Sequence, residues 1–372
     1  MADPSTAPPL TRASVEAAHK LIEPYIHRTP VLTNATLDRL ASTPRTEAEL
    51  AGTEWAGRTP ARPVLRFWFK CENFQRVGAF KARGAFHAIE RLKQEPGWVE
   101  NGGPEKGVVT HSSGNHAQAL SLAARESGIA AHIIMPSNSA LPKIAATRGY
   151  GASVTHSGPT APEREAAAAA VLAKTGGRMV PPYNHPDIIL GQGTAALELQ
   201  AQFLQRTTAN DKRKLRAIIT PCGGGGLLSG TALACEGTGV AVFGAEPSFE
   251  GADDARRGLE TGERIRAVTT TTIADGLRTP VGEIPWSIIH DRKLVRGIYS
   301  VSEDDIKRTL RLVYERVKII VEPSSVVGLA VALFNEDFRS LVEREGGEEG
   351  WDLGVVFTGG NVNLDILGSL IA

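Results

Sequence analysis

The chain has 372 residues, 41 basic and 41 acidic side chains, and 42% hydrophobic residues. This length predicts one large or two medium domains, and the balanced charge gives no field that favours nucleic acid or an anionic membrane as a partner. An apolar run of membrane-spanning length and a secretory signal pattern are both absent from the sequence. The three cysteines, Cys71, Cys222 and Cys235, fit neither a zinc site nor a disulfide framework, so we expect a cytoplasmic protein.

Strand and helix signals alternate through much of the chain. In chain order, we expect strand 107–110, helix 115–127, strand 131–135, helix 142–148, strand 152–155, helix 163–174, helix 194–205, strand 217–220, helix 227–235, strand 240–245, helices 302–317 and 324–334, and strand 353–358. Such alternation predicts parallel sheet in an α/β architecture. Residues 43–63, rich in Pro, Thr, Ala and Glu, indicate a surface insertion, and the sequence leaves its mobility open.

Four consecutive glycines, Gly223, Gly224, Gly225 and Gly226, lie between a predicted strand and a predicted helix. Glycines are useful where several backbone N–H groups must face one ligand, and a helix N-terminus attracts anions. The spacing matches neither G-x-G-x-x-G nor a P-loop with its lysine. The loop therefore indicates phosphate binding, with a flexible turn as the alternative.

A second polar loop, 110–116 (THSSGNH), lies where a predicted strand ends and a helix begins. This is the usual ligand edge of an open α/β sheet, and its N–H groups and hydroxyls suit a carboxylate. A plain helix cap is the alternative. A serine hydrolase is not indicated, because no G-x-S-x-G elbow accompanies Ser113.

Two further segments are candidates for chemistry. Lys81 begins a predicted helix between small and aromatic residues, where a lysine can be desolvated and reactive, although an ordinary surface lysine is the alternative. Residues 358–361 (TGGN) follow the last predicted strand at the same expected edge, where a turn is the alternative.

These segments together resemble the fold type II pyridoxal-phosphate enzymes of the serine racemase and serine/threonine dehydratase family. The likeness runs from about residue 26 to residue 367, in the family's order. The motifs that carry it are FK at 80–81 with RGA at 83–85, SSGNH at 112–116, GQGT at 191–194, the four glycines, ADG at 274–276, EP at 322–323 and GGN at 359–361.

The resemblance implies a role for each matching residue. It implies that Lys81 carries pyridoxal 5'-phosphate as a Schiff base, that Gly223, Gly224, Gly225 and Gly226 hold the phosphate, and that Phe80, Asn115, Asn184, Gly276, Glu322 and Thr358 surround the rest of the cofactor. It further implies that Ser112, Ser113, Asn115 and His116 bind the substrate carboxylate, with Arg164 and Thr279 near the substrate. Thr358 stands where this group usually has Ser; it keeps an uncharged hydroxyl, so we expect a mild effect.

The resemblance also favours one reaction. It implies that Lys81 is the base on one face of the substrate, and Ser113 aligns with the group on the opposite face in serine racemases. This favours a serine racemase with accompanying α,β-elimination to a keto acid and ammonia. An ammonia-lyase for threonine or threo-3-hydroxyaspartate with little racemisation remains an alternative, and so does a non-catalytic binding protein that has kept the fold.

Residues 246–254 resemble the family's divalent cation loop, with Glu246, the Ala252 carbonyl and Asp254 as ligands. Such oxygen ligands suit magnesium, manganese or calcium. This chain has two extra residues inside the loop, which leaves Ala252 and Asp254 open as ligands, and an acidic surface loop is the alternative.

The resemblance implies a tryptophan synthase beta-like fold of two domains, each an open, mostly parallel sheet flanked by helices. Residues 1–104 with 184–372 form the large cofactor-binding domain, and residues 105–183 form the small mobile domain. By analogy we expect a homodimer, a small hydroxy amino acid as substrate, and no nucleic-acid or membrane partner.

Overall fold

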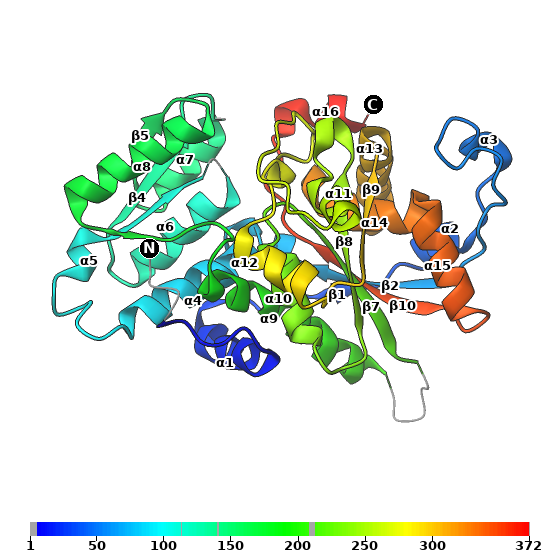
Figure 1. Ribbon diagram of the computed structural model, residues 1–372, viewed down its shortest axis with the longest axis horizontal. Coiled ribbons are helices and arrows are strands. Elements are labelled where there is room, and N and C mark those ends of the chain that lie inside the picture. Colours follow the sequence, from blue (N-terminus) through cyan, green and yellow to red (C-terminus); the bar gives the residue numbers. More distant parts are fainter. Residues whose placement is uncertain (1–5, 113, 140, 208–212, 372) are drawn as a thin grey trace.

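A computed structural model describes residues 6–112, 114–139, 141–207 and 213–371. It contains two sheets, of six and four strands (Figure 1). The six-stranded sheet has, in spatial order, β1 (Val31–Leu32), β2 (Leu65–Cys71), β10 (Trp351–Phe357), β7 (Leu215–Pro221), β8 (Ala241–Pro247) and β9 (Gly297–Val301). The four-stranded sheet has β5 (Ser153–Ser157), β4 (Ala131–Pro136), β3 (Val108–His111) and β6 (Arg178–Met179). All neighbouring strands are parallel except β1 and β2.

Helices cover both faces of the six-stranded sheet, because its strands are apolar on both sides. One face packs against α1 (Arg12–Ile22), α9 (Pro186–Arg206) and α10 (Gly226–Cys235). The other face packs against α2 (Ala35–Ser42), α13 (Glu303–Leu312), α14 (Pro323–Phe334) and α15 (Glu336–Gly346). Ile218 and Ile219 of β7, adjacent in sequence, point into these two separate cores.

The four-stranded sheet has its own smaller cores. Helices α4 (Lys81–Lys93), α6 (Asn115–Glu126) and α7 (Leu141–Gly149) pack together on one face, and α8 (Ala161–Thr175) packs on the other. In Figure 1 this sheet and its helices form the left part of the molecule. All four strands come from within the predicted 105–183 domain; the domain boundaries and the mobility stay predictions.

Short elements complete the chain. They are α3 (Glu47–Leu50), α5 (Gly103–Lys106), α11 (Asp254–Thr261), α12 (Glu283–Trp286), α16 (Leu364–Ile371), and the helical turns η2 (Glu23–Tyr25), η3 (Glu72–Phe74), η4 (Arg76–Gly78), η5 (Phe249–Gly251), η6 (Asp275–Leu277), η7 (Ser287–Asp291) and η8 (Val313–Val317). None of the helices in the described ranges is both long enough and apolar enough to cross a membrane.

The insertion 43–63 is fastened to α15. Trp55 is buried and its Nε1 donates to Asp337, Arg58 pairs with the same carboxylate, and the N–H of Ala61 donates to Glu336. A segment with a buried indole and several side-chain anchors is held in place, which answers the question that its composition left open.

Several elements differ from the sequence-based expectations, and for two of them the physical reason is clear. The helix expected over 194–205 begins earlier, at Pro186, because the His185 ring accepts from the N–H of Asp187 and Pro186 occupies the first turn. Strand β2 was not anticipated, because its run LRFWFKC is buried on both faces and shows no alternation.

Candidate active site

Lys81 lies where three segments meet at the carboxyl ends of the strands. The N–H of Phe80 donates to the carbonyl of Thr358 just after β10, at 2.9 Å, which fixes the start of α4. The Lys81 ammonium donates to the Pro182 carbonyl at 2.6 Å and lies 5.1 Å from the centroid of the Phe80 ring. Burial lowers the pKa of Lys81 to about 7, against the opposing charge of Glu322. Lys81 is therefore poised between an amine and an ammonium at neutral pH.

The four glycines form an open row of backbone donors after β7. Gly225 has a φ of 83° and precedes α10, which has no side-chain cap. No N–H group from Gly223 to Gly226 donates a hydrogen bond to any described residue. A Cβ atom on Gly224 would lie 2.3 Å from Cγ of Tyr183, so the close packing of that ring requires glycine. The loop thus offers free donors at a helix N-terminus, which is what a phosphate needs.

The polar loop after β3 leads directly into α6. The N–H of Gly114 donates to the Ser112 hydroxyl at 3.3 Å, and α6 begins at Asn115 without a side-chain cap. His116 is buried, which lowers its pKa to about 3, and its Nε2 lies 3.1 Å from the Val180 carbonyl. Since a carbonyl only accepts, Nε2 carries the proton, and the donors left for a carboxylate are backbone N–H groups and hydroxyls. Ser113 lies outside the described residues.

Asn115 connects this loop to the six-stranded sheet. Its Nδ2 donates to Glu322 at 2.9 Å and 3.2 Å, and its Oδ1 accepts from Asn361 at 2.8 Å. Burial raises the pKa of Glu322 to about 7, and the nearby charge of Asp275 acts in the same direction. Asn361 belongs to the GGN motif, but its part in the site was not anticipated, because the contact joins segments 246 residues apart.

The remaining predicted cofactor residues lie around the same site. Thr358 is buried, with its hydroxyl 3.0 Å from that of Ser325. The Gly276 N–H donates to Ser324, and a Cβ on Gly223 would lie 3.1 Å from the Gly276 carbonyl, so the two loops touch. Asn184 accepts from the N–H of Ile284 through its Oδ1 at 3.0 Å.

Two predicted substrate residues, Thr279 and Arg164, affect the pKa of Tyr183, a residue that the sequence analysis missed. Burial raises the pKa of the Tyr183 hydroxyl, while a hydrogen bond from Thr279 and the charge of Arg164 oppose the shift. Arg164 donates to the Pro159 carbonyl at 2.8 Å. An aromatic residue just before Asn184 carries no local signal of function, so only the folded structure identifies it.

Two of the predicted metal ligands are buried carboxylates. Glu246 accepts from the N–H groups of Ala255 and Arg256, and Asp254 accepts from the N–H of Val281. Burial raises the pKa of both groups, that of Asp254 to about 6, and the charge of Asp254 raises that of Glu246 further. Ala252 is also buried. The described residues contain no group of three or more His, Cys, Asp or Glu side chains arranged around a common point.

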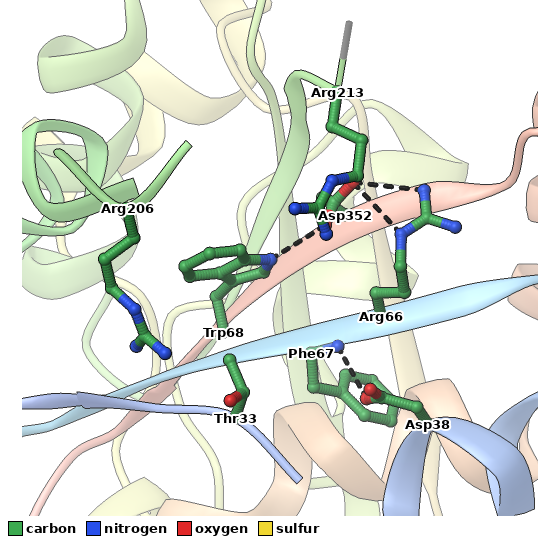
Figure 2. Close-up of a pocket in the computed structure, with 8 residues that line it drawn as sticks. All are labelled: Thr33, Asp38, Arg66, Phe67, Trp68, Arg206, Arg213 and Asp352. Carbon is green, nitrogen blue, oxygen red and sulfur yellow. Dashed lines mark hydrogen bonds and ion pairs between the residues drawn. The ribbon is translucent and has the colours of Figure 1, made fainter. Parts of the chain in front are cut away.

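A separate cleft lies at the opposite, amino-terminal edge of the six-stranded sheet (Figure 2). Its buried Asp352 accepts from Trp68 at 2.8 Å and from Arg66 at 3.0 Å and 3.2 Å. Because the ligand edge of an α/β sheet is the carboxyl edge, and because this carboxylate is already satisfied, the cleft is not the catalytic site.

Comparisons with known proteins agree with this geometry. The family described as "Pyridoxal-phosphate dependent enzyme" matches residues 53–359. The chain belongs to this family. It is 39% identical over 367 residues to the serine racemase of Dictyostelium discoideum, covering 97% of this chain and 98% of that protein. It is 37% identical to the L-threo-3-hydroxyaspartate ammonia-lyase of Saccharomyces cerevisiae, covering 97% and 96%.

The solved structure of maize serine racemase superposes with a TM-score of 0.81 at 35% identity, covering 96% of each chain. The expected fold type II architecture is therefore confirmed. The site fits pyridoxal phosphate, because it combines a partly buried lysine of lowered pKa with a row of free backbone donors.

Proposed function

We propose that this enzyme racemises serine and also eliminates water from it, giving a keto acid and ammonia. The observation that carries the proposal is a partly buried Lys81 of lowered pKa, bonded to the carbonyl of Pro182, in a fold that also holds a row of unpaired glycine N–H groups packed on the neighbouring Tyr183 ring. When bound, pyridoxal phosphate acidifies the Cα–H of an amino acid. The protein must then supply the groups that move the proton.

Lys81 is the proposed base on one face of the substrate. A catalytic base works best when its pKa lies near the working pH, and burial lowers the pKa of Lys81 to about 7. The N–H groups at the start of α6 and the Ser112 hydroxyl would hold the substrate carboxylate, with His116, Arg164 and Thr279 nearby. In this proposal Phe80, Asn115, Asn184, Gly276, Glu322 and Thr358 line the cofactor site.

Ser113 is the proposed second base, since each enantiomer presents its proton to the opposite face. Ser113→Ala should reduce serine racemisation at least about a hundredfold while leaving some elimination from one enantiomer. Chiral chromatography of the serine enantiomers measures racemisation, and keto acid formation, followed in parallel, measures elimination. Equal losses of racemisation and elimination would make Ser113 a binding residue instead.

The second candidate function is an ammonia-lyase acting on threonine or threo-3-hydroxyaspartate with little racemisation. It is favoured by the similarity to the Saccharomyces enzyme named for that substrate. Purified enzyme should be assayed with L-Ser, D-Ser, L-Thr and 3-hydroxyaspartate. Interconversion of the serine enantiomers supports the first proposal, and keto acid formation without interconversion supports the second.

A divalent cation at Glu246, the Ala252 carbonyl and Asp254 is also proposed. Burial raises the pKa of Glu246, and the charge of Asp254 raises it further; a cation bound between the two carboxylates would relieve that repulsion. Chelation should then lower the melting temperature, and magnesium should restore it. No shift of the melting temperature with chelator, together with an Asp254→Ala variant that behaves as the wild type, would exclude the cation.

The oligomer and the compartment remain proposals. A homodimer is supported by the exposed apolar side chains of Phe74 and Ile320, which lie on segments joined by a hydrogen bond from Asn73 to the Ile320 carbonyl. A molar mass of one chain, measured by light scattering, would exclude the homodimer. Three free, buried cysteines support a reducing cytoplasm.

A further inference from the structure

The GQGT motif lies near the start of α9, where this helix packs between α4 and α10. Its two glycines allow a close approach on both sides. A Cβ atom on Gly191 would lie 2.6 Å from the carbonyl oxygen of Arg83 in α4. A Cβ atom on Gly193 would lie 2.5 Å from the carbonyl oxygen of Gly230 in α10. The residue between these two glycines is Gln192, for which neither the sequence nor the site described so far gives a role.

The Gln192 side chain is fully buried between the first turns of α4 and α10. A Cβ atom on Gly84 would lie 3.1 Å from Cγ of Gln192, and one on Gly226 would lie 2.6 Å from its Oε1. Its Nε2 lies 3.5 Å from the Pro182 carbonyl oxygen, which also accepts from Lys81 at 2.6 Å. Because a carbonyl only accepts, Nε2 is the atom that faces Pro182, and Oε1 is the atom that faces the glycine loop.

The Oε1 atom of Gln192 is a buried acceptor for which the described residues supply no donor. The titratable side chains in the first two turns of α4 are bonded elsewhere: Lys81 donates to a main-chain carbonyl, Arg83 to two buried glutamates, and His87 to another main-chain carbonyl. The Tyr183 hydroxyl bonds to a threonine, and α10 carries no charged side chain. Since a buried unpaired acceptor is costly, we expect a bound ligand to supply its donor.

The ligand that the glycine loop suits is a phosphate. The N–H groups of the loop donate, so they favour phosphate oxygens that carry no proton. The Oε1 atom beside them only accepts, so it favours a phosphate oxygen that carries one. A phosphate ester whose second ionisation has a pKa of about 6 offers both kinds of oxygen once it has lost its first proton. One acceptor beside a row of donors therefore fits a singly protonated phosphate.

We propose that Gln192 is a further residue of the phosphate site, and that its Oε1 accepts a hydrogen bond from the bound phosphate in its singly protonated form. The proposal rests on the proposed function only for the presence of pyridoxal phosphate at the glycine loop. When the phosphate loses its last proton, Oε1 loses its donor and faces a second negative charge. Gln192 therefore stabilises the protonated form and raises the pH at which the phosphate ionises.

The first test measures this ionisation in the holoenzyme. The phosphorus NMR chemical shift, followed from pH 5 to 9, distinguishes the singly and doubly ionised phosphate. Gln192→Met keeps an unbranched side chain and removes the acceptor, so it should lower the midpoint of the titration by about one pH unit, the effect of one hydrogen bond to a charged group. No difference between the two proteins, or a higher midpoint in Gln192→Met, would overturn the proposal. So would a wild-type phosphate that is doubly ionised throughout this range.

The second test compares cofactor affinity with the stability of the cofactor-free protein. Gln192→Met should bind pyridoxal phosphate about tenfold more weakly at pH 6 and lose less affinity at pH 9, where the phosphate has no proton to donate. The same variant should leave the melting temperature of the cofactor-free protein unchanged or raise it, because it removes an unpaired buried acceptor. A lower melting temperature with equal affinity would show a structural role only. Tighter binding would show that Oε1 accepts from a glycine N–H and competes with the phosphate, and either result overturns the proposal.

The matched control is Gln200→Met, about 12 Å further along α9. The Gln200 amide is bonded at both ends, since it accepts from Arg12 and donates to the carbonyls of Ala196 and Ala234, each at 3.1 Å. This variant should lower the melting temperature of the cofactor-free protein and keep the wild-type phosphate titration and cofactor affinity. If it instead reproduces the Gln192→Met results, the effect belongs to the helix and the proposal fails. If the wild type acts on no amino acid, the proposed reaction fails, and the two binding measurements still decide the role of Gln192.

Discussion

At the scale of single residues, the chemistry depends on how the fold treats Lys81. An ordinary lysine has a pKa of about 10.4 and is protonated at neutral pH. Here burial lowers the pKa of Lys81 to about 7, and its side chain donates a hydrogen bond to an uncharged carbonyl rather than to a carboxylate. A carboxylate partner would have kept it charged. The Pro182 carbonyl thus orients the Lys81 side chain without raising its pKa as a carboxylate would, so part of the lysine stays a reactive neutral amine.

This lowered pKa predicts how the cofactor-free protein takes up pyridoxal phosphate. Only the neutral amine attacks the aldehyde, so the uptake rate should rise with pH and level off above pH 7, with its midpoint near 7. Stopped-flow absorbance from pH 6 to 9 measures this. Glu322→Gln, which removes the opposing charge, should move the midpoint lower. A rate that still climbs steadily at pH 9 would show an ordinary lysine.

At the scale of elements, the glycine loop leaves no room for side chains, because neighbouring segments approach its backbone closely; at Gly224 the neighbour is the Tyr183 ring. Gly224→Ala would place a methyl group 2.3 Å from that ring, so the loop or the ring must move. We expect the cofactor to bind at least about tenfold more weakly, the effect of about 1.4 kcal/mol. Gly149→Ala is the control, since a Cβ there meets nothing within 4 Å. Equal cofactor affinity in the Gly224→Ala and Gly149→Ala variants, measured by titration, would contradict the assignment of the glycine loop to phosphate binding.

Helix α4 is held by a buried cluster of four charges. Arg83 bonds Glu72 and Glu198 at 2.6–2.9 Å, and Lys70 bonds Glu198 at 2.6 Å, all essentially inaccessible to water. The charges balance, so removing one leaves an unpaired buried charge.

Arg83→Met should therefore lower the free energy of unfolding by about 3–5 kcal/mol. Adding Glu198→Gln should recover part of that loss, because the charges balance again. Urea unfolding measures both variants. A loss under about 0.5 kcal/mol for Arg83→Met, typical of surface changes, would mean that the cluster contributes little.

Local patterns predicted much of this element structure. The alternation from residue 107 to 175, the strand–glycine–helix unit around Gly224 and the capping box of Ser302 with Asp305 are all confirmed. Each depends on residues close together in sequence. The early start of α9 was not predicted, because a histidine cap is a weak sequence signal. Strand β2 was not predicted, because a strand buried on both faces shows no alternation.

At the scale of the whole molecule, the site forms because both sheets direct their carboxyl ends to one place. Lys81 and the Pro182 carbonyl are 101 residues apart, Asn115 and Glu322 are 207 apart, and Lys143 and Asp275 are 132 apart. Spacing alone does not predict such contacts. The family resemblance proposed Lys81, Asn115 and Glu322 as site residues, whereas the Pro182 contact and the ion pair between Lys143 and Asp275 are seen only in the folded chain.

The central claim is that Lys81 is the residue that carries the cofactor. The direct measurement is borohydride reduction of the holoenzyme followed by peptide mapping with mass spectrometry. The account predicts a stable phosphopyridoxyl group on the peptide containing Lys81, and no such group and no cofactor absorbance in Lys81→Ala. The group on any other lysine, or an undiminished reducible absorbance in Lys81→Ala, would contradict it.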